Sequence, residues 1–266
     1  MTGTNTVVKT PERTHSQIFH QFFDHWLIEL GTNLEQLVSA ANHNKDNNHD
    51  DSNLRHLIDK SVKHYEEFYK AKSDSAKGDV KAMFRPPWLT SLEDAFLWIA
   101  GWRPTTAIHL LYSKSGLQLE ARLDESVPVL LRTGDLGDLS LHQINRVDEL
   151  QRKTIRAERA ITEKMAKLQE SAADSFMVDL SSAASENLRK NDGDGEVKEG
   201  VGTLNSLLES KEDKLEEVLH MADGLRMETL KSVVGILTPI QAVHFLIAAA
   251  ELHLRIHDWG QKRDAT

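Results

Sequence analysis

One stretch of the sequence decides the fold: LSLHQINRVDELQRKTIRAERAITEKMAKLQESAA, residues 139–173. It contains neither glycine nor proline, so nothing in it interrupts a helix. Its apolar and small residues recur close to every third or fourth position, at Val147, Leu150, Thr154, Ala157, Ile161 and Leu168. The stretch therefore predicts a long central helix that buries one face.

The same spacing approaches the seven-residue repeat of a coiled coil. The repeat fails at Lys164, which stands between Ile161 and Leu168 where an apolar residue would continue it, with Met165 beside it. A charged residue at a core position weakens a coiled coil. We therefore favour packing inside a helical bundle over a coiled coil.

Helical periodicity also marks the sequence on both sides of this stretch. Thr90 or Ser91 is expected to cap a short helix that runs to about residue 100, and Thr238 followed by Pro239 is expected to start the last helix. The sequence predicts an all-α fold, a single bundle of about seven or eight helices. The further helices are expected at about 16–38, 54–69, 91–100, 105–113, 204–237 and 239–259.

The bundle is expected to span 14–260. Residues 1–13 are polar and predicted to be disordered, and residues 261–266 are predicted to form a polar tail. Residues 185–203 are almost free of apolar side chains and predict a flexible, disordered acidic insertion. Residues 124–138 are expected to form a loop with an apolar plug.

Composition excludes several classes of protein. The chain of 266 residues has no cysteine, which excludes disulfides, thiolate nucleophiles and cysteine-based metal centres. Its net charge of −9 and the absence of a basic run argue against autonomous DNA binding. The longest uncharged stretch, 232–250, contains the helix start at Thr238 and Pro239, which argues against a membrane span.

The sequence contains none of the common nucleotide-binding, zinc-protease, serine-hydrolase or calcium-binding motifs. We therefore predict that the protein is not an enzyme, and we name no catalytic residue.

Three groups of residues are candidates for binding. Trp98, Trp102 and Arg103 lie in the densest aromatic cluster, which indicates either core packing or an aromatic ligand groove in which Arg103 anchors a carboxylate.

His253 and His257 stand one helical turn apart. They indicate either half-buried histidines at a helix end or a haem or metal site in which one imidazole ligates a given haem.

The third group lies in the first helix. Phe22, Phe23, Trp26 and Leu27 place four large apolar side chains within six positions, which exceeds a single buried stripe. They indicate either core burial or an exposed patch that binds a partner.

Four segments, 22–30 (FFDHWLIEL), 96–104 (FLWIAGWRP), 139–171 and 237–260, together resemble the delay-of-germination domain. This plant seed-dormancy domain also forms the C-terminal part of TGA-type bZIP transcription factors. The resemblance covers roughly 14–260. Only about 15 polar residues precede it, so the chain resembles the stand-alone members without a bZIP region.

The resemblance implies a helical, non-enzymatic adaptor in seed dormancy, abscisic-acid signalling or transcription. It implies that the partners are clade A protein phosphatases 2C or transcriptional co-regulators, and that the first helix contacts them. It also implies a location in the nucleus or the cytoplasm. It also links the family to haem, for which His253 and His257 are the candidates. The alternative function is a sensor that binds haem or a fatty acyl chain. Self-association is left open.

Overall fold

The structure, a computed structural model, describes residues 15–45, 51–124, 134–190 and 194–266. In these ranges the secondary structure consists of nine α-helices and two 3-10 helices, without strands. Seven of the α-helices have 16 residues or more, and α3 and α4 have five each. The predicted all-α bundle is confirmed. The α-helices are α1 (His15–Lys45), α2 (Asp51–Ala76), α3 (Val80–Phe84), α4 (Ser91–Ala95), α5 (Thr105–Asp124), α6 (Leu141–Glu170), α7 (Ser175–Lys190), α8 (Asp194–Ile236) and α9 (Pro239–Asp264), and the 3-10 helices are η1 (Leu136–Asp138) and η2 (Ser171–Ala173).

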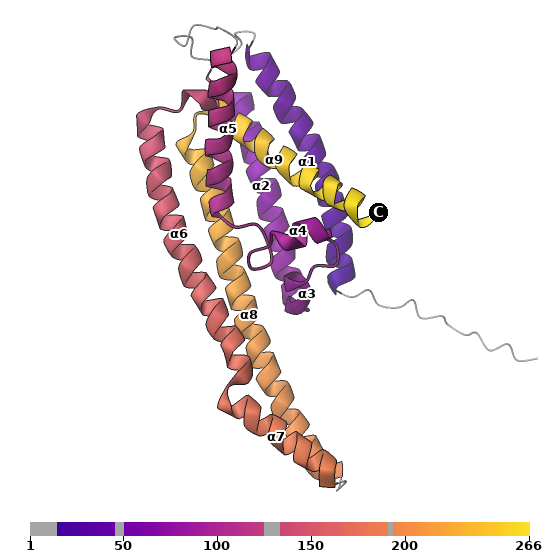
Figure 1. Cartoon of the computed structure of the whole chain (residues 1–266). Helices are drawn as coiled ribbons and strands as arrows, with labels where there is room; N and C mark the ends of the chain where they lie inside the picture. The colour runs from indigo at the N-terminus through magenta and orange to yellow at the C-terminus, as the bar shows by residue number, and fades with distance from the viewer. Residues whose placement is uncertain (1–14, 46–50, 125–133, 191–193) are drawn as a thin grey trace, which may run out of the picture.

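The helices form a compact upper bundle and a long hairpin (Figure 1). Helix α9 lies against α1 and α2 in the bundle, and the short α4 crosses its C-terminal half. Helices α6 and α8 run side by side away from the bundle, with α7 folded against α8 at the far end. The predicted long central helix is confirmed as α6, and α8, with 43 residues, is longer still.

Helix α9 is central to the core because it is covered on several sides. Val243, Phe245, Leu246 and Ala250 are buried in the main hydrophobic cluster together with residues of α1 and α2. The helix starts as predicted at Thr238, whose side chain accepts from the backbone N–H of Gln241 in a capping box.

Several predicted helix ends differ from the structure, and α1, α2 and α5 each continue beyond the predicted residue. Helix α4 starts with the expected Thr90 capping box but ends at Ala95 rather than near residue 100, because Ile99 and Ala100 adopt left-handed backbone angles. The last helix is also longer than predicted, because it includes most of the polar residues 261–266. Helix α9 continues to Asp264, and Lys262 pairs with Asp258 one turn earlier at 2.7 Å.

The predicted insertion at 185–203 forms the tip between α7 and α8. Its place in the chain is confirmed, but the backbone is helical up to Lys190 and again from Asp194, where the sequence predicted a linker. Residues 191–193 and the expected disordered segment 1–13 lie outside the described residues. So does much of the loop predicted at 124–138, and its apolar plug stays a prediction; Leu136, in the described part, is fully buried.

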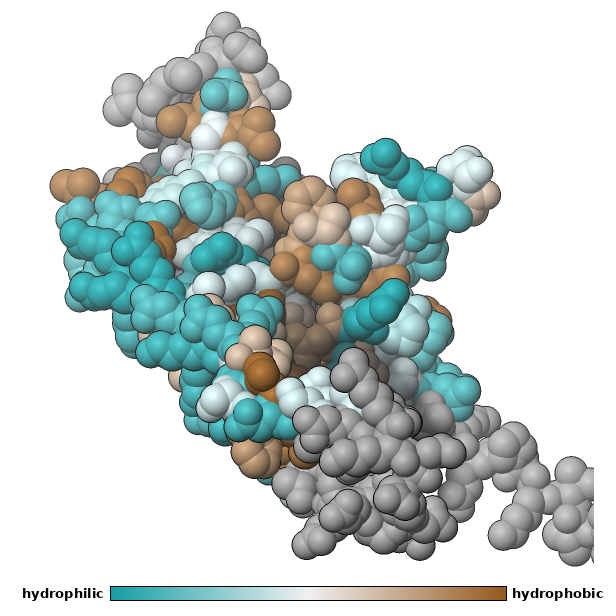
Figure 2. Space-filling model, turned by 60° about the horizontal axis from the view of Figure 1, so that its bottom comes forward, coloured by the Kyte–Doolittle hydropathy of each residue, from teal (hydrophilic) through white to brown (hydrophobic). Residues whose placement is uncertain are grey.

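The surface is mainly hydrophilic. On the face in Figure 2, hydrophobic residues gather in a hollow near the middle, between more hydrophilic flanks. Within the described ranges, no helix combines the length and apolar character that a membrane crossing requires.

Two helical glycines provide a test of how tightly α4 packs on α9. A Cβ atom at Gly260 would lie 2.0 Å from Oγ1 of Thr90, so Gly260→Ala should displace α4 and lower the free energy of unfolding by about 1–3 kcal/mol. The matched control is Gly224→Ala in α8, where a Cβ meets nothing within 4 Å. It should raise stability by up to about 1 kcal/mol. Urea unfolding would measure both, and equal shifts would contradict the packing described.

Candidate functional site

The loop at 96–104, FLWIAGWRP, joins α4 to α5 and has an unusual backbone. Ile99 and Ala100 have φ angles of 46° and 57°, which are rare for residues with a Cβ atom. The N–H of Trp98 donates to the carbonyl of Gly101 at 2.8 Å, which closes a tight turn. This strained backbone needs partners that stabilise it.

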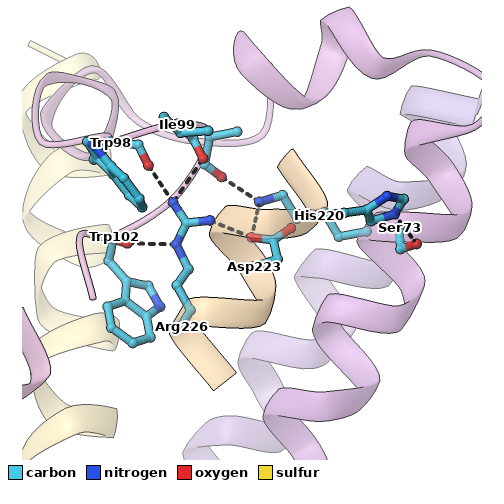
Figure 3. A network of polar contacts seen from close by, with 9 residues as sticks. Ser73, Trp98, Ile99, Trp102, His220, Asp223 and Arg226 are labelled. Carbon is cyan, nitrogen blue, oxygen red and sulfur yellow. Dashed lines mark hydrogen bonds and ion pairs between the residues drawn. The ribbon is translucent and has the colours of Figure 1, made fainter. Parts of the chain in front are cut away.

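Arg226 of α8 supplies the main partner, and its side chain is fully buried (Figure 3). The guanidinium donates to the carbonyl oxygens of Trp98, Ile99 and Trp102, at 2.9 Å for Ile99 and 2.7 Å for Trp102. It also forms an ion pair with Asp223, one turn earlier. The loop therefore wraps its carbonyl groups around one buried cation.

Lys72 of α2 completes this network. Its ammonium donates to the carbonyl of Ala100 at 2.6 Å and to Asp223 Oδ1 at 3.0 Å. Burial lowers the pKa of Lys72 to about 8, against the opposing attraction of Asp223. Gly101 allows the close approach, since a Cβ there would lie 2.8 Å from Cζ of Arg226.

The predicted ligand-groove residues are brought together in the same loop. Arg103 does hold a carboxylate, but it belongs to Glu158 of α6, at 2.8 Å, and the guanidinium lies over the ring of Trp98. Trp98 and Trp102 are half-buried, and Trp98 donates from Nε1 to Oγ1 of Thr162 at 3.0 Å. These contacts give Arg103 and Trp98 a structural role, and the ligand groove stays a prediction.

The predicted partner-binding patch on α1 is wrong for two of its four residues, because Phe23 and Trp26 are buried. Phe23 and Trp26 are 1% and 2% exposed, and Trp26 stacks on His64 with ring centroids 4.8 Å apart. Phe22 and Leu27 are half-buried against the same core. Four large residues fit because α1 packs against both α2 and α9, so two of its faces are covered. Phe23 and Trp26 therefore belong to the core.

His253 and His257 lie near each other on α9 but in different environments. The ring of His253 packs against that of Trp26, with the ring centroids 5.2 Å apart. Burial lowers the pKa of His253 to about 4. Nδ1 of His257 contacts the carboxylate of Glu93 at 2.9 Å, and its Nε2 contacts Gln261 at 3.0 Å. His257 thus links α9 to the N-terminal turn of α4.

As these side chains lie, they do not fit haem. Both nitrogens of His257 already have hydrogen-bond partners, and the ring of His253 packs against that of Trp26. The nearby apolar cavity between α1, α2 and α9, lined in part by Leu37 and Leu246, has about 10 Å³, enough for one water. Haem and acyl binding stay untested predictions that require this cluster to open.

Lys72, Asp223 and Arg226 were missed by the sequence analysis. The available signal was a pair of opposite charges three residues apart inside an otherwise apolar stripe of α8. A charged residue in such a stripe indicates a buried pair, but the sequence does not reveal which loop it holds. The buried apolar neighbours are Val218, Leu219, Ala222, Leu225 and Leu230.

Comparison with known proteins identifies the family. The family described as DOG1, seed dormancy control, matches residues 33–113, which include the 96–104 loop. "Protein DOG1-like 3" of Arabidopsis thaliana is 32% identical over 222 residues, covering 81% of this chain and 74% of that protein. The chain belongs to the DOG1 family. The resemblance to the delay-of-germination domain is confirmed.

Two other relatives of this DOG1-family chain have regulatory names. "Transcription factor TGA2.3" of Oryza sativa subsp. japonica is 30% identical over 92% of this chain and 66% of that protein. "Protein RESPONSE TO ABA AND SALT 1" of Arabidopsis thaliana is 30% identical over 95% of this chain and 99% of that protein. The relatives support a plant regulatory role in seed dormancy or transcription.

Arg226→Met tests the buried network of the DOG1-family chain. It should lower the free energy of unfolding by about 3–5 kcal/mol, because breaking a buried ion pair leaves polar groups without partners. Chemical denaturation followed by circular dichroism measures the change. Arg255→Met, on the exposed side of α9, is the control and should change stability by less than about 0.5 kcal/mol. If Arg226→Met unfolds at the same denaturant concentration as the wild type, the buried network is contradicted.

The lowered pKa of His253 predicts a pH dependence. The imidazole of His253 has a pKa near 6.5 in the unfolded chain, so on acidification the unfolded chain binds this proton before the folded chain does. The contribution of His253 to stability should therefore be constant well above pH 6.5 and fall as the pH drops from there toward 4. Melting temperatures measured across this pH range give the slope of stability against pH. His253→Gln should reduce it, whereas His25→Gln, at an exposed site on α1, should not. Equal slopes for His253→Gln and the wild type would refute the assignment.

Proposed function

We propose that this DOG1-family chain is a non-enzymatic adaptor that acts in abscisic-acid signalling or transcription through protein–protein contacts. Support comes from the names of its relatives, one a transcription factor and one a protein of the response to ABA and salt. The adaptor binds clade A protein phosphatases 2C or transcriptional co-regulators, in the nucleus or the cytoplasm. The phosphatase partner rests on the resemblance stated above.

One observation supports a docking site at the 96–104 loop. Most of the loop points inward or bonds to neighbours, whereas Phe96, the first residue of FLWIAGWRP, is 72% exposed. Exposed aromatic side chains on a rigid support are typical anchors of protein interfaces, because little entropy is lost when a partner covers them. The Arg226 network provides that rigidity.

A second exposed aromatic residue lies on the helix that packs against α4. Trp259 of α9 is 53% exposed, and its neighbour Gly260 lies against Thr90 at the start of α4. The 96–104 loop and helix α9 therefore present one large aromatic side chain each at the surface. We take Phe96 and Trp259 as the contact residues, in place of the buried Phe23 and Trp26.

The test is binding of a clade A phosphatase 2C to Phe96→Ser and Trp259→Ser by biolayer interferometry. At least one variant should lose about tenfold or more in affinity, as anchor residues do, with an unchanged melting temperature. The matched control is Leu141→Ser, because Leu141 is 73% exposed at the start of α6, away from α4.

Two results would count against the docking site. If both variants bind the phosphatase as the wild type does, Phe96 and Trp259 are not its anchors. If the wild type binds a transcriptional co-regulator and no phosphatase, the co-regulator becomes the partner, and the same variants then test the surface against it.

A further inference from the structure

A basic hollow lies between α6 and α8, on residues that the proposed adaptor surface does not use. Its volume is about 370 Å³, and it is open to solvent. Three cationic residues of α6 line it, Arg146, Lys153 and Arg156, with Glu149 as the one acidic lining residue. The protein as a whole is acidic, with a net charge of −9.

The spacing of these residues makes the hollow elongated. Positions 146, 149, 153 and 156 are three or four residues apart, so their side chains share one face of α6. The rise of a helix places Arg146 and Arg156 about 15 Å apart along its axis. A single phosphate or carboxylate group cannot contact both ends, but an extended chain can.

The positive charge of the hollow is only partly neutralised. Lys153 pairs with Glu228 of α8 at 2.6 Å. In the part of the chain that the structure describes, neither Arg146 nor Arg156 has an ion pair. Two guanidinium groups are thus available to carboxylates, which they bind in a two-pronged geometry.

Gly235 of α8 lines the hollow and adds to its depth, because it carries no side chain. Glycine inside a helix costs about 1 kcal/mol relative to alanine. Here a Cβ atom would meet nothing within 4 Å, so packing does not require the glycine. Its effect is to keep the hollow open, above an apolar floor of Leu150 and Ile236.

We propose that the hollow between α6 and α8 binds an extended acidic peptide segment of a partner protein. Carboxylates of the segment pair with Arg146 and Arg156, and an apolar side chain between them covers Leu150 and Ile236. On an acidic protein such a local basic site attracts an acidic segment in one place and in a fixed orientation. This site is separate from Phe96 and Trp259.

The experiment measures fluorescence anisotropy of a labelled peptide of about a dozen residues, rich in glutamate around a central leucine, added to the full chain at low salt. Arg146→Glu with Arg156→Glu should weaken binding at least about tenfold. The matched control is Arg152→Glu with Arg159→Glu, which makes the same change in net charge on the same helix outside the hollow. Equal weakening by the two pairs would show a non-specific charge effect and overturn the proposal.

A second pair of variants tests the shape of the hollow without changing charge. Gly235→Phe should fill it and weaken peptide binding, whereas Gly224→Phe, three turns earlier on α8, should not. Thermal melting confirms that both variants are folded. Unchanged binding by Gly235→Phe would overturn the proposal.

Other ligands provide the remaining outcomes. No saturable binding of the acidic peptide below about 1 mM, displacement of it by millimolar inorganic phosphate alone, or tighter binding of an RNA oligonucleotide would each refute the peptide site. Phe96→Ser should leave peptide binding unchanged. A failure of the phosphatase assay and a failure of this site can therefore be distinguished.

Discussion

The fold depends on the burial of one guanidinium group. Moving the charge of Arg226 out of water is costly, and the cost is offset only if the group finds a counter-charge and acceptors for its N–H groups. Asp223 provides the charge, and the carbonyl groups of the 96–104 loop provide the acceptors. The loop can adopt its left-handed backbone because Arg226 and Lys72 hold those carbonyls in place.

This arrangement makes the loop the junction of the molecule. Lys72 ties it to α2, and Arg226 ties it to α8. Glu158 of α6 accepts from Arg103 and from the backbone N–H of Thr105, which is the first residue of α5. On the other side, α4 joins α9 through Glu93 and His257. One nine-residue loop therefore fixes the upper bundle to the long hairpin, and this explains why most of its side chains are not free to bind a ligand.

The sequence predicted what depends on neighbours in the chain and missed what depends on distant ones. Apolar periodicity located the long helices, and Thr238 with Pro239 located the start of α9, because helix signals act within one turn. The pairing of Lys72 with Asp223 joins residues 151 positions apart, and no local pattern encodes it. For the same reason the apolar excess at Phe23 and Trp26 was ambiguous, because local sequence does not tell how many helices cover α1.

The buried network also determines how the two proposed surfaces relate. Helix α6 directs Glu158 toward the loop and Arg146, Lys153 and Arg156 toward the basic hollow, so one helix contributes to both sites. Communication between the sites would require an element with two alternative arrangements. Arg226 acts against this, because any shift of α8 relative to the loop would leave the buried guanidinium and the loop carbonyls without each other as partners. A rigid connection of this kind keeps the distance between the surfaces fixed, so a partner that contacts both gains from the proximity of the second site rather than from a conformational change.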